Sequence, residues 1–313
     1  MVAVLLIVGP TIVGSGANFI KTSNNEPPVA TPTSVASSQP RPSAAPPTYA
    51  GESTGPRFSQ WPENPYPPEL VYPETESDLD FYLNSNSLYD QTLAPTACSV
   101  GTVDLATASF DELDRYMTDL VACLMDAWDD PVYAAGYELP RPSVTIYSEG
   151  FTTKCGQAPA YNAFYCGADQ QLYYSYDLVQ LFSPDLREAR FMTEAIMAHE
   201  FGHTVQGRTG ILTSEAYYQE EAATPEDEAL WSRRTELQAD CFSGLFLNSI
   251  SQGSGLTAQD QANISQMFAQ LGDPPLGGDH GRSASRQYWF HVGISNNWIG
   301  ACQTFTVPAD QVS

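Results

Sequence analysis

The chain has 313 residues, and its 42% hydrophobic and 12% aromatic residues allow one sizeable packed domain, alone or with a tail. Its 37 acidic residues outnumber the 13 basic ones and give a net charge of −24 at pH 7. Because nucleic acids and anionic membranes are bound through lysine and arginine patches, we expect neither as a partner of the folded domain.

The first 20 residues contain no charged side chain and open with an apolar run from Val2 to Val8. This run is long enough for the core of a signal peptide and, extended to Ile20, barely long enough to span a bilayer. We interpret residues 1–21 as a signal peptide or a membrane anchor, which would be the only expected contact with a membrane. A buried core segment is the alternative.

Residues 22–60 are rich in Pro, Ser, Thr and Ala and include Pro27-Pro28 and Pro46-Pro47. Such a segment has too little apolar surface to offset the entropy lost on ordering, so it is typical of a disordered linker. We expect this linker to cover residues 22–75 and a folded domain to cover residues 76–313. The order is typical of an exported protein, either secreted or tethered by its N-terminal segment.

The cysteines also favour an extracytoplasmic location, because an even number in an exported domain predicts disulfides. All six follow the predicted linker: Cys98, Cys123, Cys155, Cys166, Cys241 and Cys302. Six cysteines allow 15 pairings. We expect the sequential pairs 98–123, 155–166 and 241–302, because each brackets one predicted structural unit. Free buried thiols are the alternative, and without a Cys-x-x-Cys pair a cysteine zinc knuckle is not expected.

The first predicted helix begins after Ser109, which forms a capping box with Glu112. Apolar residues then recur at helical spacing as far as Trp128. Residues 144–147 (Val-Thr-Ile-Tyr) are rich in β-branched side chains and predict a strand.

Two further strands are predicted at residues 164–166 and 172–176, joined by a turn at residues 167–169. Both are aromatic segments, and the Gly-Ala-Asp between them is typical of a turn. With the preceding strand they should form a small antiparallel sheet.

Helical patterns dominate the rest of the chain. A helix is expected from Asp185 to about Gly207, and another from Thr224, as its N-cap with proline next, to about Ile250. A shorter helix should cover 257–271, again with a threonine, Thr257, as its N-cap. Strands followed by helices, without βαβ alternation, indicate the α+β class.

His199-Glu200-Phe201-Gly202-His203 is an H-E-x-x-H motif within the first of these helices. Residues four apart lie on one helical face, so the His199 and His203 imidazoles can reach one tetrahedral ion. Glu200 is rotated by about 100° and therefore lies beside the ion, where it can take a proton from bound water. Two surface histidines beside a solvated glutamate are the alternative.

The next long helix offers a candidate for the third protein ligand. Glu236 and Asp240 are four residues apart and so share one face of it. A carboxylate ligand, with a second carboxylate accepting the free N–H of a ligand histidine, is a recurring arrangement around zinc. An exposed acidic helix face is the alternative reading of these two residues.

The H-E-x-x-H motif followed by E-x-x-x-D resembles the glutamate-type zincins, or gluzincins. More closely, the chain resembles the bacterial putative neutral zinc metallopeptidase family over roughly residues 85 to 305. Three blocks carry this resemblance: Cys155 with residues 164–169, residues 199–206 with 236–244, and residues 280–286 continuing to Cys302.

This resemblance implies a zincin-like helical domain with a small sheet and one bound Zn²⁺ ion. It implies that His199, His203 and Glu236 are the zinc ligands and that Glu200 is the general base. It also implies that Asp240 contacts a ligand rather than the metal.

His280 is a further candidate catalytic residue. It lies among glycines, which suits a loop over the site, and it could donate to the oxyanion that forms during acyl transfer. A turn histidine that bonds the backbone is the alternative. Lesser candidates are tyrosines 173, 174, 176 and 288. His291, Arg234 and Arg286 are read as structural, although either arginine could pair with a site carboxylate.

These observations predict a zinc metallopeptidase that hydrolyses peptide bonds in a peptide or protein substrate, with Glu200 activating the zinc-bound water. One of the strands before the metal helix is expected to pair with extended substrate. The alternatives are a zinc amidase acting on cell-wall peptides and a non-catalytic zinc-binding surface module.

Overall fold

The computed structural model describes residues 61–64, 66–98, 100, 103–105, 107–274 and 278–313. The predicted N-terminal segment, residues 1–21, and most of the predicted linker, residues 22–75, therefore lie outside the described residues. Among the described residues, none of the helices combines the length and apolarity needed to cross a bilayer.

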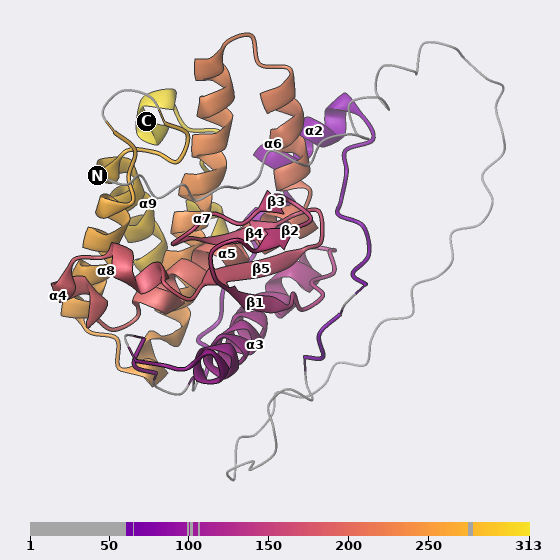
Figure 1. The fold of residues 1–313 in the computed structure, drawn as a ribbon. Coiled ribbons are helices and arrows are strands. Elements are labelled where there is room, and N and C mark those ends of the chain that lie inside the picture. The colour runs from indigo at the N-terminus through magenta and orange to yellow at the C-terminus, as the bar shows by residue number, and fades with distance from the viewer. Residues whose placement is uncertain (1–60, 65, 99, 101–102, 106, 275–277) are drawn as a thin grey trace, which may run out of the picture.

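Helices surround a small sheet, as Figure 1 shows, which confirms the α+β class. The helices are α2 (Glu76–Asn84), α3 (Phe110–Ala134), α4 (Pro184–Arg187), α5 (Met192–Arg208), α6 (Ile211–Glu220), α7 (Pro225–Ser254), α8 (Ala258–Gln270) and α9 (Ser283–Ile294). The strands are β1 (Val144–Tyr147), β2 (Thr152–Thr153), β3 (Gly156–Gln157), β4 (Ala163–Cys166) and β5 (Gln171–Ser175). Two short 3₁₀ helices, η3 (Leu178–Leu181) and η4 (Ile299–Cys302), also border the site or its supports.

Three helices begin at the predicted caps. The Ser109 and Thr257 side chains close capping boxes at the starts of α3 and α8, and Thr224 accepts the N–H of Asp227 at the start of α7. α3 continues beyond the predicted end to Ala134 and includes Pro131. Proline lacks an N–H and its ring crowds the carbonyl four residues earlier, but its own carbonyl still accepts the N–H of Ala135, so one further turn follows it.

The prediction of one continuous helix over residues 185–207 is wrong. The segment forms α4 and α5, separated by a break at Phe191, whose φ of 64° is left-handed. On an unbroken helix Leu186 and Phe191 would lie about 140° apart. The break allows both side chains to be buried in the same hydrophobic core.

The prediction of an antiparallel sheet is also wrong, because the sheet is mixed. β5 is the central strand: it pairs antiparallel with β4 and parallel with β1. The chain between β1 and β4, which contains the β2–β3 hairpin, is long enough to leave a place for β5 between them. β4 is consequently an outer strand, and α5 packs against it.

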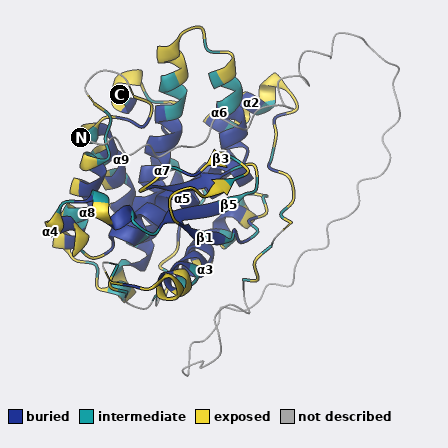
Figure 2. Ribbon diagram, in the orientation of Figure 1, coloured by how far each residue is buried: buried dark blue, intermediate teal, exposed yellow. Residues whose placement is uncertain are grey.

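The core centres on α5 and on the later part of α7, which are buried as Figure 2 shows. Residues Met192 to Arg208 of α5 are almost all buried. α9 packs closely on α7 at two glycines, Gly244 and Gly293. A Cβ atom added to Gly244 would lie 2.5 Å from the carbonyl oxygen of Phe290. α6 and the beginning of α7 form a hairpin that projects at the top of Figure 1, and most of its tip, residues 221–224, is exposed.

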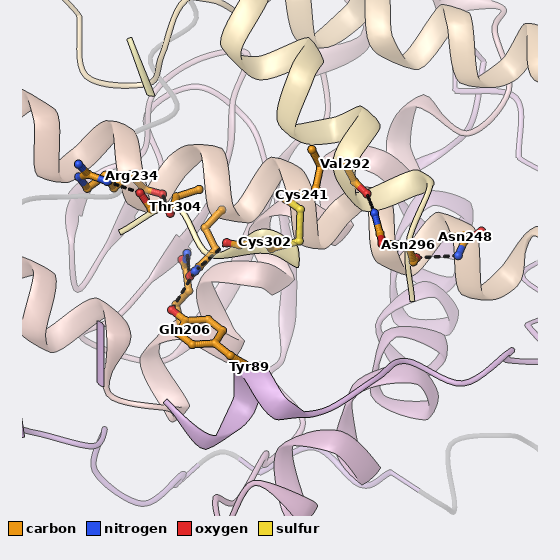
Figure 3. The surroundings of a disulfide bond; sticks show 10 residues. Tyr89, Gln206, Arg234, Cys241, Asn248, Val292, Asn296, Cys302 and Thr304 are labelled. Carbon is orange, nitrogen blue, oxygen red and sulfur yellow. Dashed lines mark hydrogen bonds between the residues drawn. A yellow bond between two sulfur atoms is a disulfide. The ribbon is translucent and has the colours of Figure 1, made fainter. Parts of the chain in front are cut away.

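The three predicted disulfides are present and no described cysteine is free. They join Cys98 to Cys123, Cys155 to Cys166 and Cys241 to Cys302. Disulfides of this number are typical of proteins that fold in an oxidising compartment, and they support an extracytoplasmic environment. Figure 3 shows the pair that joins α7 to η4.

Candidate active site

The two histidines of the H-E-x-x-H motif face one another at the centre of α5. Their side chains are buried, and the Nδ1 atom of each has a hydrogen-bond partner: Asp240 Oδ1 for His199 and Gln206 Oε1 for His203, both at 2.8 Å. With each Nδ1 atom engaged in this way, the two Nε2 atoms lie next to each other, 3.2 Å apart. The predicted juxtaposition of the imidazoles is therefore found.

Glu236 of α7 lies against both imidazoles. One of its carboxylate oxygens, Oε2, is 3.3 Å from Nε2 of His199, and the other, Oε1, is 3.5 Å from Nε2 of His203. One potential ligand atom from each of the three residues lies within 4.8 Å of the other two. Oε2 is buried and has no hydrogen-bond partner.

These separations fit a tetrahedral zinc ion. With bonds of about 2.05 Å, two ligand atoms of such an ion lie about 3.3 Å apart. The two Nε2 atoms are 3.2 Å apart, and Glu236 offers one oxygen to each of them, at 3.3 and 3.5 Å, so these separations are close to this value. Two imidazole nitrogens and one carboxylate also form a donor set typical of catalytic zinc, which keeps a fourth position for water.

Glu200 occupies the place beside this cluster that the helical period predicts. It is 2% exposed, and its Oε2 accepts the backbone N–H of Tyr165 in β4 at 3.1 Å. Its Oε1 is buried and lacks a hydrogen-bond partner. Burial, with the nearby charge of Glu236, raises the pKa of Glu200 to about 8.

The charges of the cluster are strongly coupled. Burial opposes the charged form of both imidazoles, and it lowers the pKa of His203 to about 4. For His199 the nearby carboxylates of Asp240 and Glu236 outweigh burial and raise its pKa to about 9. Burial alone would raise the pKa of Glu236, but His203 and His199 outweigh it, and the pKa falls well below its ordinary value.

Asp240 contacts His199, and it is also paired with Arg286. Nε and Nη2 of Arg286 donate to the two carboxylate oxygens of Asp240 at 2.8 and 2.7 Å, and both side chains are fully buried. The structural reading of Arg286 thus understates its place beside the site. Arg234 instead donates to the carbonyl oxygens of Thr304 and Val307.

Sequence reasoning missed the support of His203. Gln206 accepts from His203, and its Nε2 donates to the carbonyl oxygen of Thr235 and to Oε1 of Gln238. Nε2 of Gln238 in turn donates to Tyr89 and to the carbonyl oxygen of Cys302, beside the disulfide shown in Figure 3. The spacing of three residues from His203 could have identified Gln206.

His280 lies in the segment between α8 and α9 and is 7% exposed. Its Nδ1 is 2.7 Å from Asp279 and 3.6 Å from Asp273, and Asp273 also accepts the backbone N–H groups of His280 and Gly281. Burial disfavours the charged imidazole, but Asp273, Asp279 and Glu236 outweigh it and raise the pKa of His280 well above its ordinary value. The imidazole of His280 is thus close enough to Glu236 for the two charges to interact.

The remaining candidate residues, four tyrosines and His291, have no hydrogen bond with this cluster among the described residues. The hydroxyls of Tyr173, Tyr174 and Tyr176 lie within hydrogen-bond distance of Asp169, Thr193 and Ala108, respectively, and Tyr288 is exposed. His291 contacts Ser265.

Glu215 of α6 is a buried carboxyl that the motifs do not reveal. It is 4% exposed, and its Oε1 lacks a hydrogen-bond partner. Burial, followed by the charge of Glu236, raises its pKa to about 8. A second acidic side chain therefore lies within electrostatic reach of the cluster.

Comparisons with known proteins identify relatives that share this region. A family model described as "Putative neutral zinc metallopeptidase" matches residues 85–305. The chain is 28% identical over 208 residues to the uncharacterized protein YpfJ of Escherichia coli (strain K12), covering 62% of this chain and 72% of that protein. It is 30% identical over 190 residues to the uncharacterized protein Rv2575 of Mycobacterium tuberculosis (strain H37Rv), covering 53% and 63%. No solved structure matches the chain.

Proposed function

This chain belongs to the putative neutral zinc metallopeptidase family, and we propose that it is a zinc-dependent peptidase. In this proposal His199, His203 and Glu236 hold one zinc ion and Glu200 is the general base. The observation that carries it is the buried cluster of two imidazoles and one carboxylate at separations close to those around zinc, with the partly unpartnered carboxyl of Glu200 next to it. A purely structural zinc site has no use for Glu200.

Zinc, when bound, lowers the pKa of a coordinated water and polarises the scissile carbonyl group. Glu200 accepts a proton from the water as the water oxygen bonds to the carbonyl carbon. Glu200 then gives this proton to the amide nitrogen as the C–N bond breaks, which yields a carboxylic acid and an amine. The Tyr165 N–H holds one oxygen of Glu200 and leaves the other, Oε1, available for this transfer.

Asp240 and Gln206 fix the orientation of the two ligand histidines, because each accepts or shares the Nδ1 proton. Arg286 holds Asp240 in place through two hydrogen bonds. His280, kept in its cationic form by Asp273 and Asp279, would donate to the developing oxyanion.

The expected substrate is a peptide or protein in extended form. β4 is an outer strand, and it lies beside Glu200 through the hydrogen bond from Tyr165. An extended peptide could therefore approach along this strand, whose backbone would supply part of the affinity. The disulfides favour an extracytoplasmic place of action, either secreted or tethered by residues 1–21.

The test is to replace Glu200 by Gln in the full-length exported protein. We expect zinc content to be unchanged and hydrolysis of an unfolded protein substrate to fall by at least about 1,000-fold, whereas the exposed substitution Glu220→Gln should leave both unchanged. Hydrolysis by the wild type should stop with a chelator and return with zinc. Retained turnover in Glu200→Gln would refute the assignment.

Two other functions would give different results in the same experiment. A zinc amidase would cleave cell-wall peptide fragments but leave the unfolded protein intact. A non-catalytic zinc module would bind zinc and cleave neither.

A further inference from the structure

Glu215 is a buried acidic side chain that the proposed reaction does not use. It lies on α6 and is 4% exposed, and its Oε1 is buried without a hydrogen-bond partner. Among the described residues it forms no ion pair with an arginine, lysine or histidine. Burying a carboxyl group in this state costs free energy that no partner offsets. A purely structural role therefore does not account for Glu215.

The α6–α7 hairpin places Glu215 close to Glu236. The two helices run side by side in Figure 1, and Tyr218 stacks on Trp231 with ring centroids 4.6 Å apart, so these two residues lie level with each other. Measured from this level away from the tip, Glu215 lies about 4.5 Å along α6 and Glu236 about 7.5 Å along α7. The charge of Glu236 also adds to burial in raising the pKa of Glu215. Glu215 consequently lies beside the candidate zinc site.

A metal ion is a poor partner for Glu215. Among the described residues, neither of the two groups of His, Cys, Asp or Glu side chains that could hold a metal ion includes it. Zinc and calcium are held by several protein ligands together. An ammonium or guanidinium group, in contrast, forms a strong hydrogen bond with a single carboxylate. An organic cation is therefore the better match for this side chain.

The surrounding charge favours such a cation. The nearby group that interacts with Glu215 is the acidic Glu236, and the whole chain carries a net charge of −24. Zinc, when bound, would balance the charge of Glu236 but would leave Glu215 without a partner. An approaching cation would be attracted by the negative potential and would favour the carboxylate form of Glu215.

The position of α6 indicates which part of a substrate Glu215 would meet. In the proposed reaction Glu200 gives its proton to the leaving nitrogen, so the C-terminal half of the substrate lies on the Glu200 side of the site. α6 instead follows the C-terminal end of α5, beyond His203. The half of the substrate that precedes the scissile bond consequently lies nearer to Glu215.

We propose that Glu215 is a specificity-determining residue that binds a positively charged group of the substrate on the N-terminal side of the scissile bond. This group is either the free α-ammonium of an N-terminal residue or the side chain of a lysine or arginine. The inference rests on the proposed peptidase function, and it adds a substrate class to it.

Two pairs of peptides distinguish the two sources of positive charge. The first pair has no basic side chain and differs only in a free or an acetylated amino terminus. The second pair is acetylated and has lysine or norleucine before the scissile bond. We expect kcat/KM of the wild type to be at least about 10-fold higher for the charged member of one pair, because a hydrogen bond to a charged group is worth about 10–100-fold. Mass spectrometry of the products identifies the bond that is cut.

Two glutamine substitutions connect the preference to Glu215. Glu215→Gln removes the charge and keeps the size, so the ratio of kcat/KM between the charged and the neutral peptide should fall by about 10-fold or more. Because this substitution removes a buried carboxyl without a partner, the variant should fold. Glu220→Gln removes the same charge from the exposed end of α6 and should leave the ratio unchanged.

Binding to the Glu200→Gln variant separates this inference from the peptidase proposal. The charged peptide should bind this variant more tightly than the neutral one, as measured by isothermal titration calorimetry without turnover, and Glu200→Gln/Glu215→Gln should lose the difference. Absence of hydrolysis of every substrate, with this binding preference retained, would overturn the peptidase proposal alone. Equal kcat/KM and equal affinity within both pairs, or a preference that Glu215→Gln does not reduce more than Glu220→Gln, would overturn the role of Glu215.

Discussion

The substitution Asp240→Asn tests whether this buried carboxylate supports the candidate metal site, the fold, or both. Asp240 bonds Arg286 at 2.8 and 2.7 Å and lies 2.8 Å from Nδ1 of His199, all in the interior. The substitution leaves Arg286 buried without its paired carboxylate, so the free energy of unfolding of the zinc-free protein should fall by about 3–5 kcal/mol. Weaker support of His199 should lower zinc affinity by about 10–100-fold.

The double variant Asp240→Asn/Arg286→Met separates these two effects. Because it removes both members of the ion pair, most of the lost stability should return, whereas the zinc affinity should stay low. Urea unfolding of the zinc-free proteins measures stability, and competition with a chromophoric chelator measures zinc affinity. Asp260→Asn, at the buried cap of α8, is the control that should affect stability only. The reasoning is refuted if Asp240→Asn binds zinc as the wild type does, or if the double variant is no more stable than the single one.

Two further predictions concern stability. Burial raises the pKa of Glu215 from 4.5 to about 8, so folding is fully supported by its protonated form below pH 4.5 and loses stability as the pH rises through 8. Glu215→Gln should thus match the wild type in urea unfolding at pH 4 but exceed it by about 4–5 kcal/mol at pH 8.5; equal stability at both pH values would exclude a buried carboxyl with a raised pKa. Replacing Cys241 and Cys302 together by Ala should lower stability by about 4 kcal/mol, because this disulfide spans 61 residues; a loss below 1 kcal/mol would contradict the estimate.

The helices that carry the site could be predicted because their signals are local. The spacing of His199 and His203 depends only on the helical period, and the cap at Thr224 places Glu236 on the following helix. The disulfide pairs were also predictable from the order of the predicted units. Each of these inferences uses residues that are close in sequence, or one covalent pair at a time.

What could not be predicted depends on contacts between distant segments. The parallel pairing of β1 with β5 depends on where the chain returns to the sheet after residue 157. The alternation of apolar residues in a strand does not indicate which neighbour that strand will pair with. The break before α5 follows from burying Phe191, which is a tertiary effect. Arg286 lies 46 residues from Asp240, so its role required the packing of α9 on α7. Glu215 has no motif, and only its burial distinguishes it.

The α6–α7 hairpin offers a practical route for handling this protein. Its exposed tip ends at Thr224, and Glu236 lies 12 positions further along α7, which corresponds to about 18 Å of helix. A fluorophore, affinity tag or surface linker placed between Glu221 and Thr224 would therefore sit well away from the candidate zinc site. Immobilisation through this point would leave the candidate site accessible for real-time binding measurements.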